Sequence, residues 1–128
     1  MSNLSDYAET LLANFIANAQ TATRPTSWYL GLFTAAPSDA GGGTELSGFG
    51  YARQAATFGA ASSGVVSNTS THTYTASGGS WGTITHYGVF DALTTGNLLW
   101  HGALTMPRTI ADGEILTVAA GAFTLTMA

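Results

Sequence analysis

The 128-residue chain contains no cysteine and no lysine. Without cysteine it forms no disulfide framework, no thiolate zinc site and no cysteine nucleophile. Without lysine, the glycine run 41–43 does not qualify as a phosphate-binding loop, because that loop needs a lysine after its glycines to reach the phosphates. These two absences exclude several classes of enzyme and metal protein, and they leave the compartment open.

Charged residues of both signs are scarce. Three arginines and seven acidic residues make up 8% of the chain, against about 25% in a typical soluble domain. A folded monomer of this mass exposes about 6,400 Å², which gives about one charge per 640 Å². The net charge of −4 and the scattered arginines leave no basic surface for phosphates, which excludes nucleic-acid binding by charge. We expect much of the surface to face other protein, and Arg24, Arg53 and Arg108 to lie at specific pairings or interfaces.

Motifs for catalysis, metal binding and membrane insertion are also missing. No apolar run approaches the length of about 20 residues that spans a bilayer, and residues 1–6 lack the basic start and apolar core of a signal peptide. No Gly-x-Ser-x-Gly elbow accompanies His72, His86 or His101, and these histidines show none of the short spacings of metal ligands. The acidic residues specify no catalytic carboxylate pair. We therefore predict a non-enzymatic protein with no metal site, no cofactor and no membrane segment.

The first residues have helical periodicity. Ser2 or Asn3 is placed to cap the start of a helix, and Asp6 and Glu9 suit the positive end of its dipole. We predict one helix over about 4–18, with an apolar face that packs on the sheet or on a neighbouring subunit. Its apolar side chains recur at three- and four-residue spacings: Leu4, Ala8, Leu11, Leu12, Phe15 and Ile16.

Beyond residue 27 the pattern is typical of short strands separated by turns. In the last run Phe123, Leu125 and Met127 alternate with threonines, which is the period of a half-buried strand. The longest loop is expected over 35–50. We predict a mainly β fold, an antiparallel β-sandwich or jelly-roll-like small barrel with one N-terminal α-helix, as a single domain over 1–128 with the sandwich at about 27–127. The predicted strands are 28–34, 51–58, 71–76, 80–90, 98–104, 114–118 and 122–127.

Aromatic residues are the strongest candidates for a ligand surface. Trp81 and Trp100 are flanked by glycine or histidine rather than by a continuous apolar run. Large aromatic side chains contribute much of the stability of a small domain, so packing in the core or at an interface is favoured for most of them. A sugar-stacking platform built from exposed tryptophans is the alternative.

Arg53 is expected to have a designated partner because cations are so few. Asp39, Glu45 and Asp91 are all plausible, and the sequence does not choose between them. With the histidines and the helix face included, the candidate interface or ligand contacts are Arg53, Trp81, Trp100, His86, His101, Leu11 and Phe15.

Three blocks in the chain carry a family resemblance. They are WYLGLFTAAPSDAGGGTELSGFGYARQ (28–54), SWGTITHYGVFDA (80–92) and GNLLWHGAL (96–104). In this order they resemble a family of small tailed-phage virion proteins that are commonly labelled tail fibre or minor structural proteins, and the likeness covers about residues 4–127.

The resemblance implies a structural role in an assembled virion and carries over no catalytic residue. It leaves open a capsid decoration (cement) protein and a small tail or fibre component. It further implies contacts with other capsid or tail proteins, assembly in the host cytoplasm and a homo-oligomer, for which we predict a trimer. The alternative function is a carbohydrate- or host-surface-binding β-sandwich module of the virion.

Overall fold

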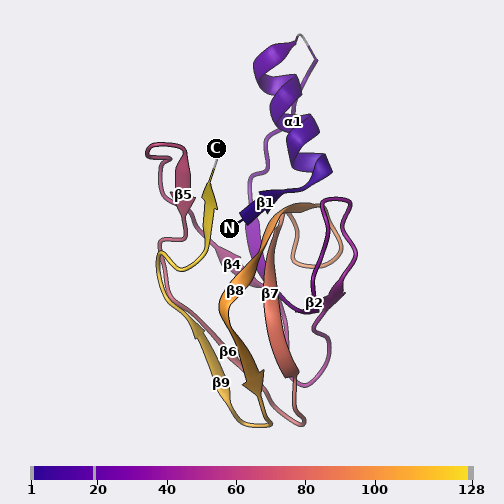
Figure 1. The fold of residues 1–128 in the computed structure, drawn as a ribbon, viewed down its shortest axis with the longest axis vertical. Coiled ribbons are helices and arrows are strands. Elements are labelled where there is room, and N and C mark those ends of the chain that lie inside the picture. Colours follow the sequence, from indigo (N-terminus) through magenta and orange to yellow (C-terminus); the bar gives the residue numbers. More distant parts are fainter. Residues whose placement is uncertain (1, 19, 127–128) are drawn as a thin grey trace.

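Sheet pairing organises most of the chain. The computed structural model describes residues 2–18 and 20–126 (Figure 1). Its main sheet has six antiparallel strands in the order β1-β8-β7-β2-β3, with β4 also paired to β2. The strands of this sheet are β1 (Ser2–Leu4), β2 (Trp28–Ala35), β3 (Thr44–Glu45), β4 (Gln54–Ala56), β7 (Gly82–Phe90) and β8 (Leu98–Ile110).

Two antiparallel ribbons complete the β structure. One pairs β6 (His72–Thr75) with β9 (Ile115–Val118), and the other pairs β5 (Val65–Ser67) with β10 (Thr124–Thr126). In Figure 1 both ribbons lie to one side of the main sheet. The arrangement is sandwich-like, and it confirms the predicted mainly β, antiparallel fold with one helix.

The core lies between the main sheet and the ribbons. Leu30 and Leu32 of β2 and Ile84 of β7 are fully buried and face Tyr74 and Leu116 of the ribbon β6–β9 within one apolar cluster. β6 and β9 each bury alternate residues, as strands with one face on a core do. On β2 four consecutive residues are buried, because the opposite face of the sheet is covered too.

A small second cluster covers that opposite face. It consists of Phe33, Phe90 and Leu98. The Phe33 and Phe90 rings stack at 6.0 Å between centroids. Beneath them Gly31 and Gly88 pair across β2 and β7, and a Cβ atom on Gly88 would come within 2.9 Å of the Phe33 ring. Two facing glycines therefore leave the space that the rings fill.

The helix α1 (Asp6–Ala17) begins later than predicted. Residues 2–4 form β1 instead, because their backbone pairs with β8, with Leu4 opposite Trp100. The cap is Ser5 rather than Ser2 or Asn3: its hydroxyl accepts from the Ala8 amide at 3.1 Å and donates to the Leu98 carbonyl. The helix start is thus fixed to β8 by tertiary contacts that a local pattern does not contain.

Other strand boundaries also differ from prediction. The predicted strand 51–58 shortens to β4, and β1, β3 and β5 were not predicted. β8 continues to Ile110 because its register against β7 shifts between Ile84 and His86, so Pro107 falls where the ladder is irregular and no donor is needed. Met127 lies outside the described residues.

Candidate assembly surface

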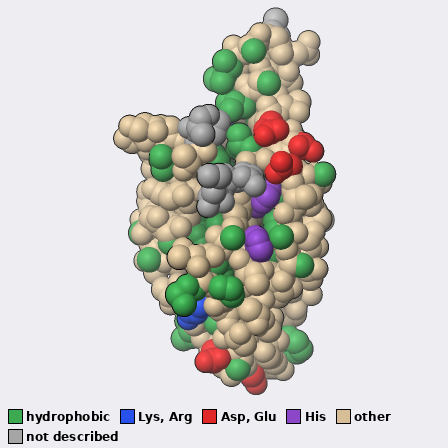
Figure 2. All heavy atoms as spheres, in the orientation of Figure 1, with side chains coloured by type: hydrophobic (Ala, Val, Ile, Leu, Met, Phe, Trp, Pro, Cys, Tyr) green, Lys and Arg blue, Asp and Glu red, His purple; other side chains and the backbone are tan. Residues whose placement is uncertain are grey.

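Helix α1 stands out from the body of the molecule (Figure 1). Ala8 is its buried residue, whereas Phe15 and Ile16 near its end are 75% and 71% exposed. A helix of 12 residues is marginal in water unless its apolar face is packed. The outer end of α1 is therefore an apolar surface that the described part of the chain leaves uncovered, and Figure 2 shows hydrophobic side chains along this projecting part of the molecule. Across residues 2–18 and 20–126, no helix has the length and apolar character to cross a membrane.

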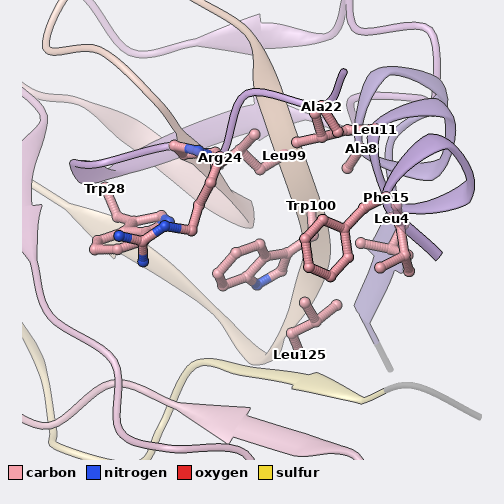
Figure 3. Close-up of a pocket in the computed structure, with 12 residues that line it drawn as sticks. Leu4, Ala8, Leu11, Phe15, Ala22, Arg24, Trp28, Leu99, Trp100 and Leu125 are labelled. Carbon is pink, nitrogen blue, oxygen red and sulfur yellow. The ribbon is translucent and has the colours of Figure 1, made fainter. Parts of the chain in front are cut away.

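An apolar groove of about 370 Å³ lies between α1 and the sheet (Figure 3). One wall is α1 and the other is the segment that leads into β2. Arg24 is the one charged residue among those that line it, and Figure 3 shows Arg24 and Trp28 across the groove from Phe15, with Trp100 between them. The lining residues are Leu4, Ala8, Leu11, Leu12, Phe15, Ala22, Arg24, Pro25, Trp28, Leu99, Trp100 and Leu125.

Both candidate tryptophans are buried. Trp100 is 5% exposed and packs edge-on against Phe58 with ring centroids 5.0 Å apart, and its Nε1 has no hydrogen-bond partner. Trp81 is also 5% exposed, and its Nε1 donates to the Phe49 carbonyl at 3.0 Å. Both tryptophans are therefore part of the core cluster, although the sequence made them the candidates for a ligand surface. Neither ring offers an open face on which a sugar would stack.

Arg53 pairs with Glu45, one of its three predicted partners. Its Nε and Nη2 donate to the two carboxylate oxygens at 2.8 Å each. Its Nη1 donates to the carbonyls of Ala92 and Thr95 at 2.9 and 2.7 Å, and the guanidinium carbon lies 3.5 Å from the centre of the Phe90 ring. Each of the three guanidinium nitrogens donates to a partner within the chain, so Arg53 links Glu45 of β3 to the turn that contains Ala92 and Thr95.

Tyr51 completes the polar cluster around this ion pair. Its hydroxyl donates to Glu45 at 2.7 Å and accepts from the Leu32 amide at 3.0 Å. Burial, followed by the hydrogen bond to Glu45, raises the pKa of Tyr51 well above its usual range. The cluster therefore holds a neutral tyrosine against a carboxylate, which suits a fixed structural junction rather than proton transfer.

The three histidines occupy separate places. His101 is buried on β8, with Nε2 3.0 Å from an Asp39 carboxylate oxygen, and the Asp39 carbonyl accepts from the Asp6 amide at the start of α1. His86 is half-buried on β7, with Nδ1 beside the preceding threonine hydroxyl. His72 is buried on β6, and burial lowers its pKa. Within the described ranges no three acidic or histidine side chains are grouped to hold a metal ion.

The structure brings three of the predicted contact residues together. Leu11, Phe15 and Trp100 line the same groove, whereas Arg53, Trp81, His86 and His101 lie elsewhere. Sequence reasoning missed Trp28 and Leu125 as parts of this surface, and it expected Arg24 at a pairing or an interface without connecting it to the helix face. Arg24 and Trp28 lie four residues apart, but they, Leu125 and the helix face come from three segments far apart in the chain, so no local periodicity connects them. Arg24 stands beside Pro25 as the one charged residue of the segment 18–27, and this was the signal in the sequence that could have indicated the surface.

The chain matches a known protein family. A family model described as podophage GP4 fiber I protein gp80 matches residues 3–126, which include α1, the groove and both ribbons. No curated protein matches the chain.

Proposed function

The chain belongs to the phage fibre family of the podophage GP4 fiber I protein gp80, and on that premise we propose that it is a non-enzymatic structural subunit of a podophage tail fibre. The match over residues 3–126 is the observation that carries this proposal. It favours a fibre over capsid decoration because the family is described as a fibre protein. The phage virion is where such a protein resides, and we propose that it assembles there after synthesis in the host cytoplasm.

The surface chemistry supports assembly through α1 and its groove. The chain has 8% charged residues, and its exposed large apolar side chains include Phe15 and Ile16 at the helix end. Covering each of these two side chains contributes about 2 kcal/mol before the entropy cost of association. We propose that copies of the same chain cover this surface, as a homotrimer, and that the assembled fibre contacts other virion proteins.

The buried polar groups support a role without catalysis. Arg53 donates four hydrogen bonds, two to Glu45 and two to backbone carbonyls. His101 is paired with Asp39, and His72 is enclosed on β6. Each of these groups serves the fold, and the groove itself is almost entirely apolar. A carbohydrate-binding role receives no support from Trp81 or Trp100, since both are buried.

Two measurements test the proposal. Cryo-electron microscopy of phage particles should locate the chain in the tail fibres, and its density on the capsid surface alone would contradict the fibre assignment. Sedimentation of the purified chain should show a trimer that Phe15→Ser and Ile16→Ser each weaken. Met106→Ser is the matched control, because Met106 is as exposed as Ile16 and lies on β8 outside the groove. A native chain that stays monomeric at high concentration would overturn self-assembly.

A further inference from the structure

Arg24 marks the rim of the apolar groove. It is exposed and lines the groove beside Trp28. The ion pairs among the described residues are Arg53–Glu45 and His101–Asp39, so Arg24 has no charged partner within them. An unpaired cation next to an apolar recess favours an occupant that is apolar with an acidic residue alongside.

The outer edge of α1 has this combination. Glu9, Leu12 and Ile16 are spaced by three and four residues, so they lie along one edge of the helix. Glu9 is exposed, as is Ile16, and Ile16 does not line the groove of its own chain. The first turn is acidic, and the last turn has no basic residue. Leu12 lines the groove of its own chain, so this edge presents the Ile16 side chain to a partner, with the Glu9 carboxylate two turns before it.

The helix of one chain does not fill its own groove. Leu11, Leu12 and Phe15 already form a wall of that groove, whereas Ile16 is not among the residues that line it. A second copy supplies a helix with the free edge that the first copy's groove requires. Identical chains of net charge −4 repel each other, so a contact between Arg24 and Glu9 also offsets part of this repulsion.

We propose that the groove of one copy receives the edge of α1 that carries Glu9 and Ile16 from a second copy, with Ile16 of the entering helix inside the groove and Glu9 of its first turn paired with Arg24 at the rim. We call this contact the seat. It joins two different surfaces of the chain and is therefore heterologous, so copies related by a rotation axis close a ring when each makes the same contact. The inference rests on the proposed function, in which α1 and the groove form the assembly surface, and it specifies which parts of that surface meet.

Charge reversal tests the ion pair. Arg24→Glu and Glu9→Arg should each raise the dissociation constant of self-association about tenfold, because an attractive contact becomes a repulsive one. The variant with both changes should return to within about twofold of native. The control combines Glu9→Arg with Arg108→Glu, which has the same net charge, since Arg108 is exposed on β8 away from the groove. This control should stay weak.

Cross-linking tests the seat directly, and the cysteine-free chain allows single reporter residues. Glu9→Cys and Arg24→Cys are mixed, one of them carrying a mass tag, and treated with a short bismaleimide. Cross-linked heterodimers should form in the mixture, and neither variant alone should cross-link. Cross-linking of Glu9→Cys with itself would show paired helices and overturn the proposed seat.

The outcomes separate the two levels of the proposal. If Ile16→Ser leaves self-association unchanged, α1 is not the assembly surface and the proposed mode of assembly fails. If Ile16→Ser weakens association but the double charge reversal remains as weak as its control, the assembly surface stands and the pairing of Arg24 with Glu9 is wrong.

Discussion

Arg53, just before β4, and Glu45 of β3 form an ion pair with two parallel hydrogen bonds. Both hydrogen bonds are 2.8 Å long, and the side chains are 9% and 23% exposed. The remaining arginine donor reaches two carbonyls of the 91–97 turn. Because each partner leaves a charge without compensation when the other is removed, the pair makes these segments sensitive to substitution.

Replacing Arg53 with lysine should destabilise the chain by about 3 kcal/mol. A lysine ammonium does not reproduce the planar pair of donors that binds Glu45, and it loses the hydrogen bonds to the carbonyls of Ala92 and Thr95. Urea unfolding followed by tryptophan fluorescence measures the change. Arg108→Lys, at an exposed site, should stay within about 0.5 kcal/mol of native. Equal stability of Arg53→Lys and the native chain would contradict this assignment.

Ser5→Ala should lower the free energy of unfolding by about 1–2 kcal/mol. The substitution removes the cap on the Ala8 amide and the hydrogen bond to the Leu98 carbonyl, both at buried positions. Circular dichroism during thermal unfolding follows the loss. Thr10→Ala, at an exposed position in the same helix, should be neutral or slightly stabilising because alanine has the higher helix propensity. A similar effect of both changes would show that capping is not the cause.

Gly88→Ala should cost about 1–3 kcal/mol through overpacking. The added methyl group would come within 2.8 Å of Leu98 and 2.9 Å of Phe33, both of which are buried. Gly59→Ala is the matched control, because its nearest neighbour is 3.5 Å away and its φ angle lies outside the left-handed region. Chemical denaturation compares the two. If Gly88→Ala proves as stable as Gly59→Ala, the second cluster is looser than described.

Stability should fall at alkaline pH. Burial raises the pKa of Tyr87 to about 12, and it raises the pKa values of Tyr74 and Tyr51 as well. In the unfolded chain a tyrosine loses its proton near pH 10, whereas the native chain keeps it. The stability from these groups is therefore complete below pH 10 and decreases as the pH rises toward 12, by about 1.4 kcal/mol per pH unit for each group.

Denaturant unfolding from pH 9 to 12 measures this slope. Tyr87→Phe should make the fall in the free energy of unfolding with pH less steep, by the contribution of one tyrosine. The substitution also removes the hydrogen bond from Tyr87 to the Thr124 carbonyl. A stability that is constant from pH 9 to 12 would mean that these tyrosines titrate as freely in the native chain as in the unfolded one.

Much of the strand pattern was predictable because it is local. β2, β6, β7, β9 and β10 each fall within or close to a predicted run, since alternation and turn residues act over a few positions. β1, β3 and β5 have two or three residues each. They are strands because they pair with distant segments, so intrinsic strand propensity does not predict them. The candidate surface was predicted in part, through Leu11 and Phe15 on the helix face, and through Trp100 as an aromatic of undetermined role.

The sequence alone determined that this chain is mainly β with one helix, poor in charge and equipped with few cations, because composition and periodicity are properties of neighbouring residues. It also carried the blocks that resemble phage virion proteins. Only the tertiary structure decided that Arg53 binds Glu45, that Trp81 and Trp100 are buried, and that α1 and the segment around Arg24 enclose one groove. These outcomes depend on contacts between residues far apart in the chain, and the register of β1, β8, β7 and β2 sets those contacts.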